Sequence, residues 1–133
     1  MTNFKKLHFL LWILCSCGAS SDYSEGLSGG WEFIRESADG KILYRGIDDR
    51  SVPCKILAFD YNRDFIVAAQ RPTKECFNEK DTIYYKQGKN DIYYWIISHH
   101  PDSIYGPLLP GEYYVLRGIL KVPGELRLDL KVL

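Results

Sequence analysis

Residues 54–71 read Cys-Lys-Ile-Leu-Ala-Phe-Asp-Tyr-Asn-Arg-Asp-Phe-Ile-Val-Ala-Ala-Gln-Arg. Two apolar runs flank the polar turn Tyr61-Asn62-Arg63-Asp64, which is the pattern of a β-hairpin. We therefore predict two antiparallel strands, Cys54–Tyr61 and Asp64–Arg71. Because Phe65–Ala69 is apolar at every position, the second strand should be buried on both faces and lie at the centre of a sheet.

The rest of the chain repeats this pattern of short apolar or alternating runs between turn residues. The connections are too short for parallel crossovers, so consecutive strands should pair antiparallel. Residues Ile92–Ile97 are again apolar throughout and indicate a second central strand. This second central strand is predicted over Asp91–Ser98. The further predicted strands are Trp31–Glu36, Lys41–Gly46, Thr82–Gln87, Ser103–Gly106 and Leu126–Lys131.

One helix is predicted near the C-terminus. Pro110 and Gly111 open it, Tyr113, Leu116 and Leu120 recur at helical spacing, and Pro123-Gly124 ends it. The predicted fold is mainly β, with a single twisted antiparallel meander sheet of about six to eight strands and one short C-terminal helix. A small closed barrel is the alternative, because a sheet of this size must curl or protect its edges.

Length and composition limit the classes of protein that this chain can belong to. It has 133 residues, of which 46% are hydrophobic, which suits one compact domain with a packed core. It carries 17 Lys+Arg against 17 Asp+Glu. Sequence-independent phosphate binding needs a basic surplus, so we expect no nucleic-acid partner.

The first residues resemble a bacterial export signal. Met1–Lys6 carries two lysines and no acid, and Leu7–Cys15 is an uncharged run too short to span a membrane. The stretch Leu14-Cys15-Ser16-Cys17 resembles a lipobox, with Leu three positions before and a small residue directly before Cys17. We expect residues 1–16 to be a lipoprotein signal peptide and Cys17 to be acylated, for example with palmitate. An ordinary signal peptide with a chance cysteine is the alternative.

This interpretation predicts a protein of the bacterial cell envelope, outside the cytoplasm and anchored to a membrane through its N-terminal lipid. Residues 17–30 would then comprise the lipidated cysteine and a Gly/Ser-rich tether with a reach of about 20 Å. Residues 31–133 would form a single β-rich domain that begins near Trp31.

Two further cysteines, Cys54 and Cys76, lie in the expected mature domain. An exported protein can keep disulfides, and two cysteines allow one pairing, so we predict a Cys54–Cys76 bridge. Two buried free thiols or half of a metal site are the alternatives, although the pair lacks the spacing typical of zinc ligands.

No motif predicts catalysis, a metal or a cofactor. In His99-His100-Pro101-Asp102 the adjacent imidazoles should point to opposite sides, which favours a solvated hairpin turn over a zinc site. Asp60, Asn62 and Asp64 have the spacing that begins a calcium loop, but Phe65 and Arg71 stand where Gly and a bidentate Glu are needed. This stretch also favours a turn.

Paired tyrosines are the most unusual feature of the sequence. In a strand, adjacent side chains lie on opposite faces, so one tyrosine of each pair can fill the core while the other is exposed. The exposed members would suit contact with a protein or a glycan. The favoured interpretation is aromatic pairing across strands that only stabilises the sheet. The candidate interaction surface comprises Tyr84, Tyr85, Tyr93 and Tyr94.

Several stretches resemble a family of small, functionally uncharacterised bacterial lipoproteins. They are Ser21-Asp22-Tyr23, Leu27 with Gly29-Gly30-Trp31, Ile56–Asp60, Phe65–Ala68, Tyr94–Ile97, Ile104-Tyr105-Gly106-Pro107-Leu108 and the tail Val122-Pro123-Gly124-Glu125-Leu126. The chain departs from the resemblance at Leu109-Pro110-Gly111, where a polar helix cap is expected. The resemblance implies no catalytic residues.

The sequence therefore favours a membrane-anchored, non-enzymatic binding module whose partner is an envelope protein or glycan. A small envelope hydrolase that uses a carboxylate pair is one alternative. An immunity or inhibitor lipoprotein that blocks a partner enzyme is the other. A pocket with two facing acids would favour the hydrolase, and an exposed tyrosine patch would favour the binding module.

Overall fold

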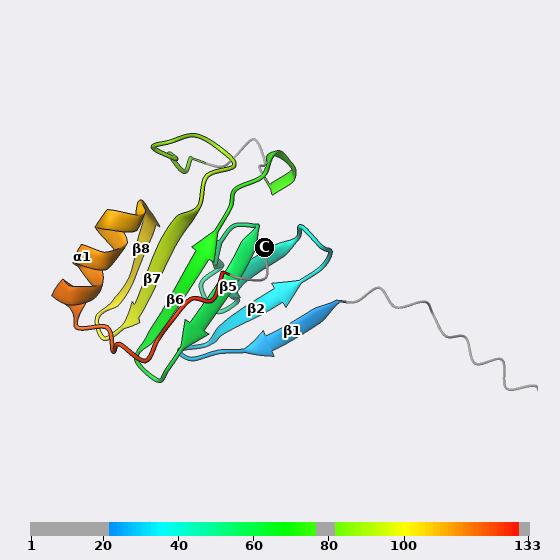
Figure 1. The fold of residues 1–133 in the computed structure, drawn as a ribbon. Coiled ribbons are helices and arrows are strands. Elements are labelled where there is room, and N and C mark those ends of the chain that lie inside the picture. The colour runs from blue at the N-terminus through cyan, green and yellow to red at the C-terminus, as the bar shows by residue number, and fades with distance from the viewer. Residues whose placement is uncertain (1–21, 77–81, 131–133) are drawn as a thin grey trace, which may run out of the picture.

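The computed structural model describes residues 22–76 and 82–130. These residues form two four-stranded antiparallel sheets and one α-helix (Figure 1). The first sheet comprises β1 (Tyr23–Gly26), β2 (Trp31–Arg35), β3 (Lys41–Arg45) and β4 (Arg50–Val52) in that order. The second comprises β5 (Ile56–Tyr61), β6 (Phe65–Gln70), β7 (Tyr93–His99) and β8 (Asp102–Leu108), followed by α1 (Pro110–Leu120). A short 3₁₀-helix, η1, spans Lys74–Cys76.

The predicted mainly-β meander with a C-terminal helix is confirmed, but its strands do not form one sheet. β4 ends at Val52, and Pro53 follows it directly. Proline has no backbone N–H to continue a ladder, so the chain leaves the first sheet there and begins the second at Ile56. The described strands form two open sheets. The predicted single sheet and the alternative of a closed barrel are therefore both wrong.

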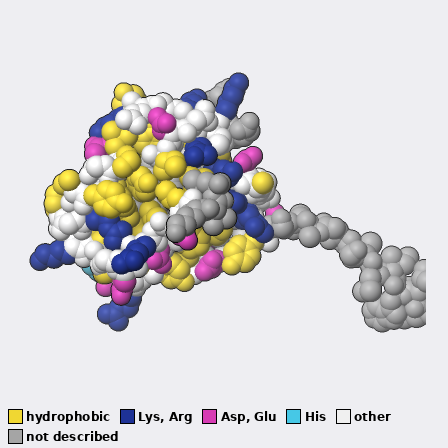
Figure 2. Space-filling view, viewed as in Figure 1, with side chains coloured by type: hydrophobic (Ala, Val, Ile, Leu, Met, Phe, Trp, Pro, Cys, Tyr) yellow, Lys and Arg dark blue, Asp and Glu magenta, His cyan; other side chains and the backbone are white. Residues whose placement is uncertain are grey.

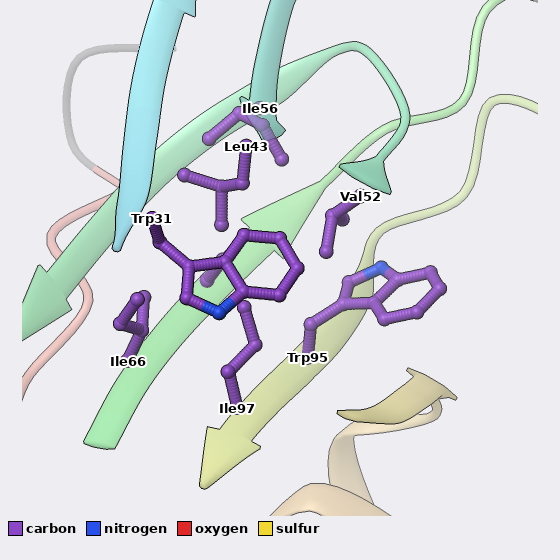
Figure 3. Close-up of a cluster of buried hydrophobic side chains, with 8 residues drawn as sticks. Trp31, Leu43, Val52, Ile56, Ile66, Trp95 and Ile97 are labelled. Carbon is purple, nitrogen blue, oxygen red and sulfur yellow. The ribbon is translucent and has the colours of Figure 1, made fainter. Parts of the chain in front are cut away.

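A first hydrophobic core fills the space between the two sheets (Figure 3). Trp31, Leu43 and Val52 enter it from the first sheet. Ile66 and Trp95 enter it from β6 and β7 of the second. Trp31 is 1% exposed, and the burial of such large side chains is the main force that holds the sheets together.

A second core covers the opposite face of the second sheet. Val67 of β6 and Ile96 of β7 pack there against Tyr113 of α1 and Leu126 of the segment that follows the helix. In Figure 1 this C-terminal segment crosses the face of β5 and β6, beside α1. The second sheet is therefore covered on both faces, which explains why the predicted central strands β6 and β7 are apolar throughout.

The ordered sheet begins earlier in the chain than expected. β1 lies within the stretch that we predicted as a tether, and it pairs with β2 from Tyr23 opposite Arg35 to Gly26 opposite Glu32. Gly29 and Gly30 both have positive φ angles, and the Trp31 N–H donates to the Ser28 carbonyl. This is the two-residue turn that joins tightly paired strands. The boundary at Trp31 is corrected to Tyr23.

Two predicted strands are absent from the described residues. Residues Thr82–Gln87 form an irregular connection, because β6 pairs directly with β7 and each has its other edge occupied by β5 or β8. Residues 126–130 form no ladder either, because Leu126 packs on the second sheet's face and not along its edge. Lys131 lies outside the described residues. The structure also contains the short strand β4, which we did not predict.

The helix begins at the predicted Pro110 despite its unusual start, and it ends at Leu120, shortly before Pro123. Leu109 provides no side-chain cap, and Pro110 occupies the first turn. The Leu109 backbone N–H instead donates to Glu112 Oε1 at 3.0 Å, and Lys86 Nζ lies 2.6 Å from Glu112 Oε2. These two contacts lower the pKa of the Glu112 carboxyl, with the Lys86 hydrogen bond as the larger cause. Lys121 ends the helix in the left-handed conformation.

The predicted disulfide joins Cys54 and Cys76, which lie 22 positions apart in sequence. Cys54 lies between β4 and β5, and Cys76 ends the 3₁₀-helix in the long connection after β6. The bridge therefore fixes the start of that connection to the point where the chain passes from one sheet to the other.

Candidate binding site

A groove lies between α1 and the C-terminal segment. Its volume is about 420 Å³, which is in the range of small-ligand sites. Figure 2 shows hydrophobic side chains gathered across this face of the molecule, with Lys and Arg side chains among and around them. The groove is lined by Tyr94, Tyr113, Tyr114, Arg117, Gly124, Leu126, Arg127, Leu128 and Leu130.

Three tyrosines form the aromatic part of the groove. The Tyr94 and Tyr113 rings are stacked, with centroids 4.7 Å apart and an interplanar angle of 19°. The Tyr113 and Tyr114 rings meet edge to face at 5.5 Å. Tyr113 is buried, whereas Tyr114 is 71% exposed. Burial raises the pKa values of Tyr94 and Tyr113 above the ordinary value of 10.0.

Two arginines supply the charge of the groove. Arg117 Nη1 donates to the Tyr113 hydroxyl at 2.7 Å, its Nη2 donates to the Pro123 carbonyl at 3.0 Å, and the guanidinium lies 5.4 Å from the Tyr113 ring centroid. Arg127 donates from Nε to the Gly124 carbonyl at 3.3 Å. The described lining contains no carboxylate, so the groove is positively charged.

The outer surface of α1 is unusually apolar for a helix that faces solvent. Val115 is 65% exposed and Ile119 is 69% exposed, one turn apart beside Tyr114. They border a second hollow of about 440 Å³, lined by Leu108, Gly111, Glu112, Val115, Leu116 and Ile119. Clustered exposed apolar side chains are typical of contact surfaces.

The structure separates the four tyrosines of the predicted interaction surface. Tyr85 is 8% exposed and Tyr93 is fully buried, and their rings pack at 5.0 Å. Tyr84 is 76% exposed, on the irregular connection before β7. Tyr94 lies in the groove with Tyr113 and Tyr114, two tyrosines outside the predicted interaction surface. The helical spacing of Tyr113 predicts that it faces the core, but no sequence pattern indicates that Tyr94 stacks on it.

A second cluster lies where the turns of the two sheets meet. Ser28 Oγ lies 2.9 Å from His99 Nε2, a contact between residues 71 positions apart. Arg45 and Arg50 lie within 3.0 Å of Asp102, and both lie within 6 Å of the Trp31 ring centroid. The Asp102 carboxylate thus forms ion pairs with both arginines.

His99 does not complete a catalytic triad. Its buried Nδ1 has no hydrogen-bond partner among the described residues. The Ser28–His99 pair therefore lacks the carboxylate that orients the histidine of a triad. The cluster joins the two sheets, and we assign it a structural role.

The carboxylate pair that the hydrolase alternative requires is not found in the described hollows. The groove has no acidic lining residue, and the hollow beside α1 contains Glu112 alone. A third hollow, of about 320 Å³ near β5, contains Asp129 as its one acid. Among residues 22–76 and 82–130, no three His, Cys, Asp or Glu side chains gather into a metal-binding group.

Fold and groove together define a small mainly-β domain of two sheets with one helix on the outer face of the second. The chain belongs to the protein family of unknown function DUF3997, whose model matches residues 28–132. No curated protein and no solved structure matches the chain. In the described part of the chain, no helix has the length and apolar character needed to cross a membrane.

Proposed function

We propose that this protein is a membrane-anchored extracytoplasmic lipoprotein that acts as a non-enzymatic binding module, with the groove and the outer surface of α1 as its contact surface. The observation that carries the proposal is the joint exposure of Tyr114, Val115 and Ile119 beside the groove. Leaving three large apolar side chains in water has a free-energy cost that contact with a ligand or partner would remove.

The proposed anchor is Cys17, which lies outside the described residues. Its support is the lipobox-like stretch Leu14-Cys15-Ser16-Cys17 after a short uncharged run. Mass spectrometry of the purified mature N-terminus tests this assignment. We expect a protein that begins at an acylated Cys17, and an unmodified Cys17 or an intact Met1 would contradict it.

The position of β1 supports an outward-facing contact surface. Five residues separate Cys17 from Tyr23, and such a segment spans at most about 20 Å. The domain would therefore stay close to the membrane, with β1 nearest to the anchor. Figure 1 shows α1 at the opposite end of the molecule from β1. In the anchored protein the groove would then face away from the membrane.

Photocrosslinking in intact cells tests the contact surface in the full-length, lipidated protein. The photoreactive p-benzoylphenylalanine would replace Tyr114 in one variant and Tyr84 in a matched control, because both tyrosines are mostly exposed. We expect a crosslinked envelope component with the probe at position 114 and none at position 84. Equal crosslinking at both positions, or none at either, would contradict the proposal.

A further inference from the structure

We infer that the groove binds an anionic saccharide, with its carboxylate on Arg127 and Arg117 and its sugar ring on Tyr114. This inference rests on the proposed binding function and specifies the chemical class of the ligand.

Charge complementarity selects an anion. Arg117 and Arg127 line the groove, and no described carboxylate lines it with them. A guanidinium presents paired N–H groups that match the two oxygens of a carboxylate. An anion would therefore gain two charge-assisted contacts without displacing an acidic side chain.

Both arginines are held in place before a ligand arrives. The Tyr113 hydroxyl and the Pro123 carbonyl each accept a hydrogen bond from Arg117. The Gly124 carbonyl accepts one from Arg127 Nε, and within the described residues the terminal nitrogens of Arg127 have no hydrogen-bond partner. Preorganised side chains lose less conformational entropy on binding, so they contribute more to affinity.

The tyrosines favour a sugar ring over a peptide. A pyranose carries hydroxyl groups around its rim and C–H groups on its faces, so it can stack on an aromatic ring and accept hydrogen bonds at the same time. Tyr114 offers a mostly exposed ring, and Tyr94 and Tyr114 both line the groove with side chains that carry a hydroxyl group. The volume of about 420 Å³ suits one or two sugar residues.

The inference can be tested with two sugars that differ by one acidic group. N-acetylmuramic acid is N-acetylglucosamine with an added carboxylate-bearing ether. Ligand-observed NMR with the purified full-length protein in detergent should show that the acidic sugar binds about tenfold more tightly, as expected for a charge-assisted contact. Arg127→Ala should remove this difference, and Tyr114→Ala should weaken binding of both sugars.

Two matched variants control for general effects. Arg63 is an exposed arginine in the β5–β6 turn, and Tyr84 is an exposed tyrosine outside the groove. Arg63→Ala and Tyr84→Ala should bind both sugars as the wild type does. Equal affinity for the two sugars, or an equal loss with Arg63→Ala, would overturn the inference.

The remaining outcomes separate this inference from the proposed function. If neither sugar binds while the probe at position 114 still crosslinks an envelope component, the saccharide assignment fails and the binding function stands. Tighter binding of the tripeptide Glu-Glu-Glu with the same dependence on Arg127 would assign the groove to an acidic peptide and overturn the saccharide. If both the sugars and the crosslinking fail, both proposals are wrong.

Discussion

The imidazole of His99 lies against the backbone of Gly29, and its Nε2 is 2.9 Å from the hydroxyl of Ser28. Ser28 and Gly29 belong to the β1–β2 turn of the first sheet, and His99 is the last residue of β7 in the second. Arg45 and Asp102 make a second link between the sheets nearby, at 2.8 Å. Polar contacts thus fix the relative position of the sheets at this end, beside the apolar core that packs between them.

Gly29→Ala is expected to destabilise the fold by about 1–3 kcal/mol. Gly29 has a φ of +65°, and an added Cβ would lie 2.4 Å from the His99 ring, so both the backbone and the ring would have to move. Gly26 provides the control, because a Cβ there meets no atom within 4 Å. Urea denaturation should show a loss for Gly29→Ala only, and equal stability of the two variants would contradict the role of the turn.

His99 is expected to make stability depend on pH. Burial lowers the pKa of His99 below its ordinary value of 6.5, against the opposing effect of Asp102. The unfolded chain therefore takes up this proton at higher pH than the folded chain does. The stability that neutral His99 contributes is present above about pH 6.5 and is lost as the pH falls below it.

Thermal unfolding at about pH 7.5 and pH 5.5 measures this contribution of His99. Asp64, Arg45 and His100 also act on His99, so the informative quantity is the difference between variants. The decrease in Tm on acidification should be smaller for His99→Gln than for the wild type. His100→Gln, which changes the exposed neighbour and removes one of the smaller causes of the shift, should retain most of the wild-type decrease. A full decrease in His99→Gln would show that other groups cause it.

The sequence predicts the position of a strand where its apolar pattern determines that position. The prediction fails where tertiary contacts determine it. Phe65–Ala69 could be placed at a sheet centre because an apolar run on both faces requires cover on both sides. The four residues of β1 have no such pattern, and the sequence therefore predicts that they belong to the tether. Gly29-Gly30 was the usable signal for this hairpin, because two residues with positive φ angles suit a tight turn.

The groove was only partly predictable, for a related reason. Tyr94 was a candidate because it stands in a tyrosine pair, and the helical spacing of Tyr113 predicted its burial. Their stacking depends on how α1 crosses the second sheet, which no local pattern encodes. Arg127 lies in a segment that alternates like a strand, yet this segment covers a face of the sheet. Arg127 therefore lines the groove from this covering segment, and not from the strand that the sequence predicts.

Loss of the Cys54–Cys76 bridge is expected to reduce the free energy of unfolding by about 3 kcal/mol, because the bridge restricts the unfolded chain. The double variant Cys54→Ala, Cys76→Ala removes the bridge without leaving a free thiol. Its urea midpoint should be lower than that of the oxidised wild type and should not respond to a reducing agent. A wild type that is equally stable with and without the reducing agent would contradict the prediction.

Gln70→Leu is expected to destabilise the fold by about 3 kcal/mol, because it leaves buried polar groups without partners. Gln70 is fully buried, its Nε2 donates to the Pro53 carbonyl at 2.9 Å, and its Oε1 accepts from Trp95 Nε1 at 2.6 Å. Leucine has a similar size but can replace neither contact. Gln87→Leu is the control, because Gln87 is exposed and its hydrogen bond to Tyr93 uses the backbone N–H. Urea denaturation should show the loss for Gln70→Leu alone, and wild-type stability of that variant would mean that these two hydrogen bonds contribute little to the fold.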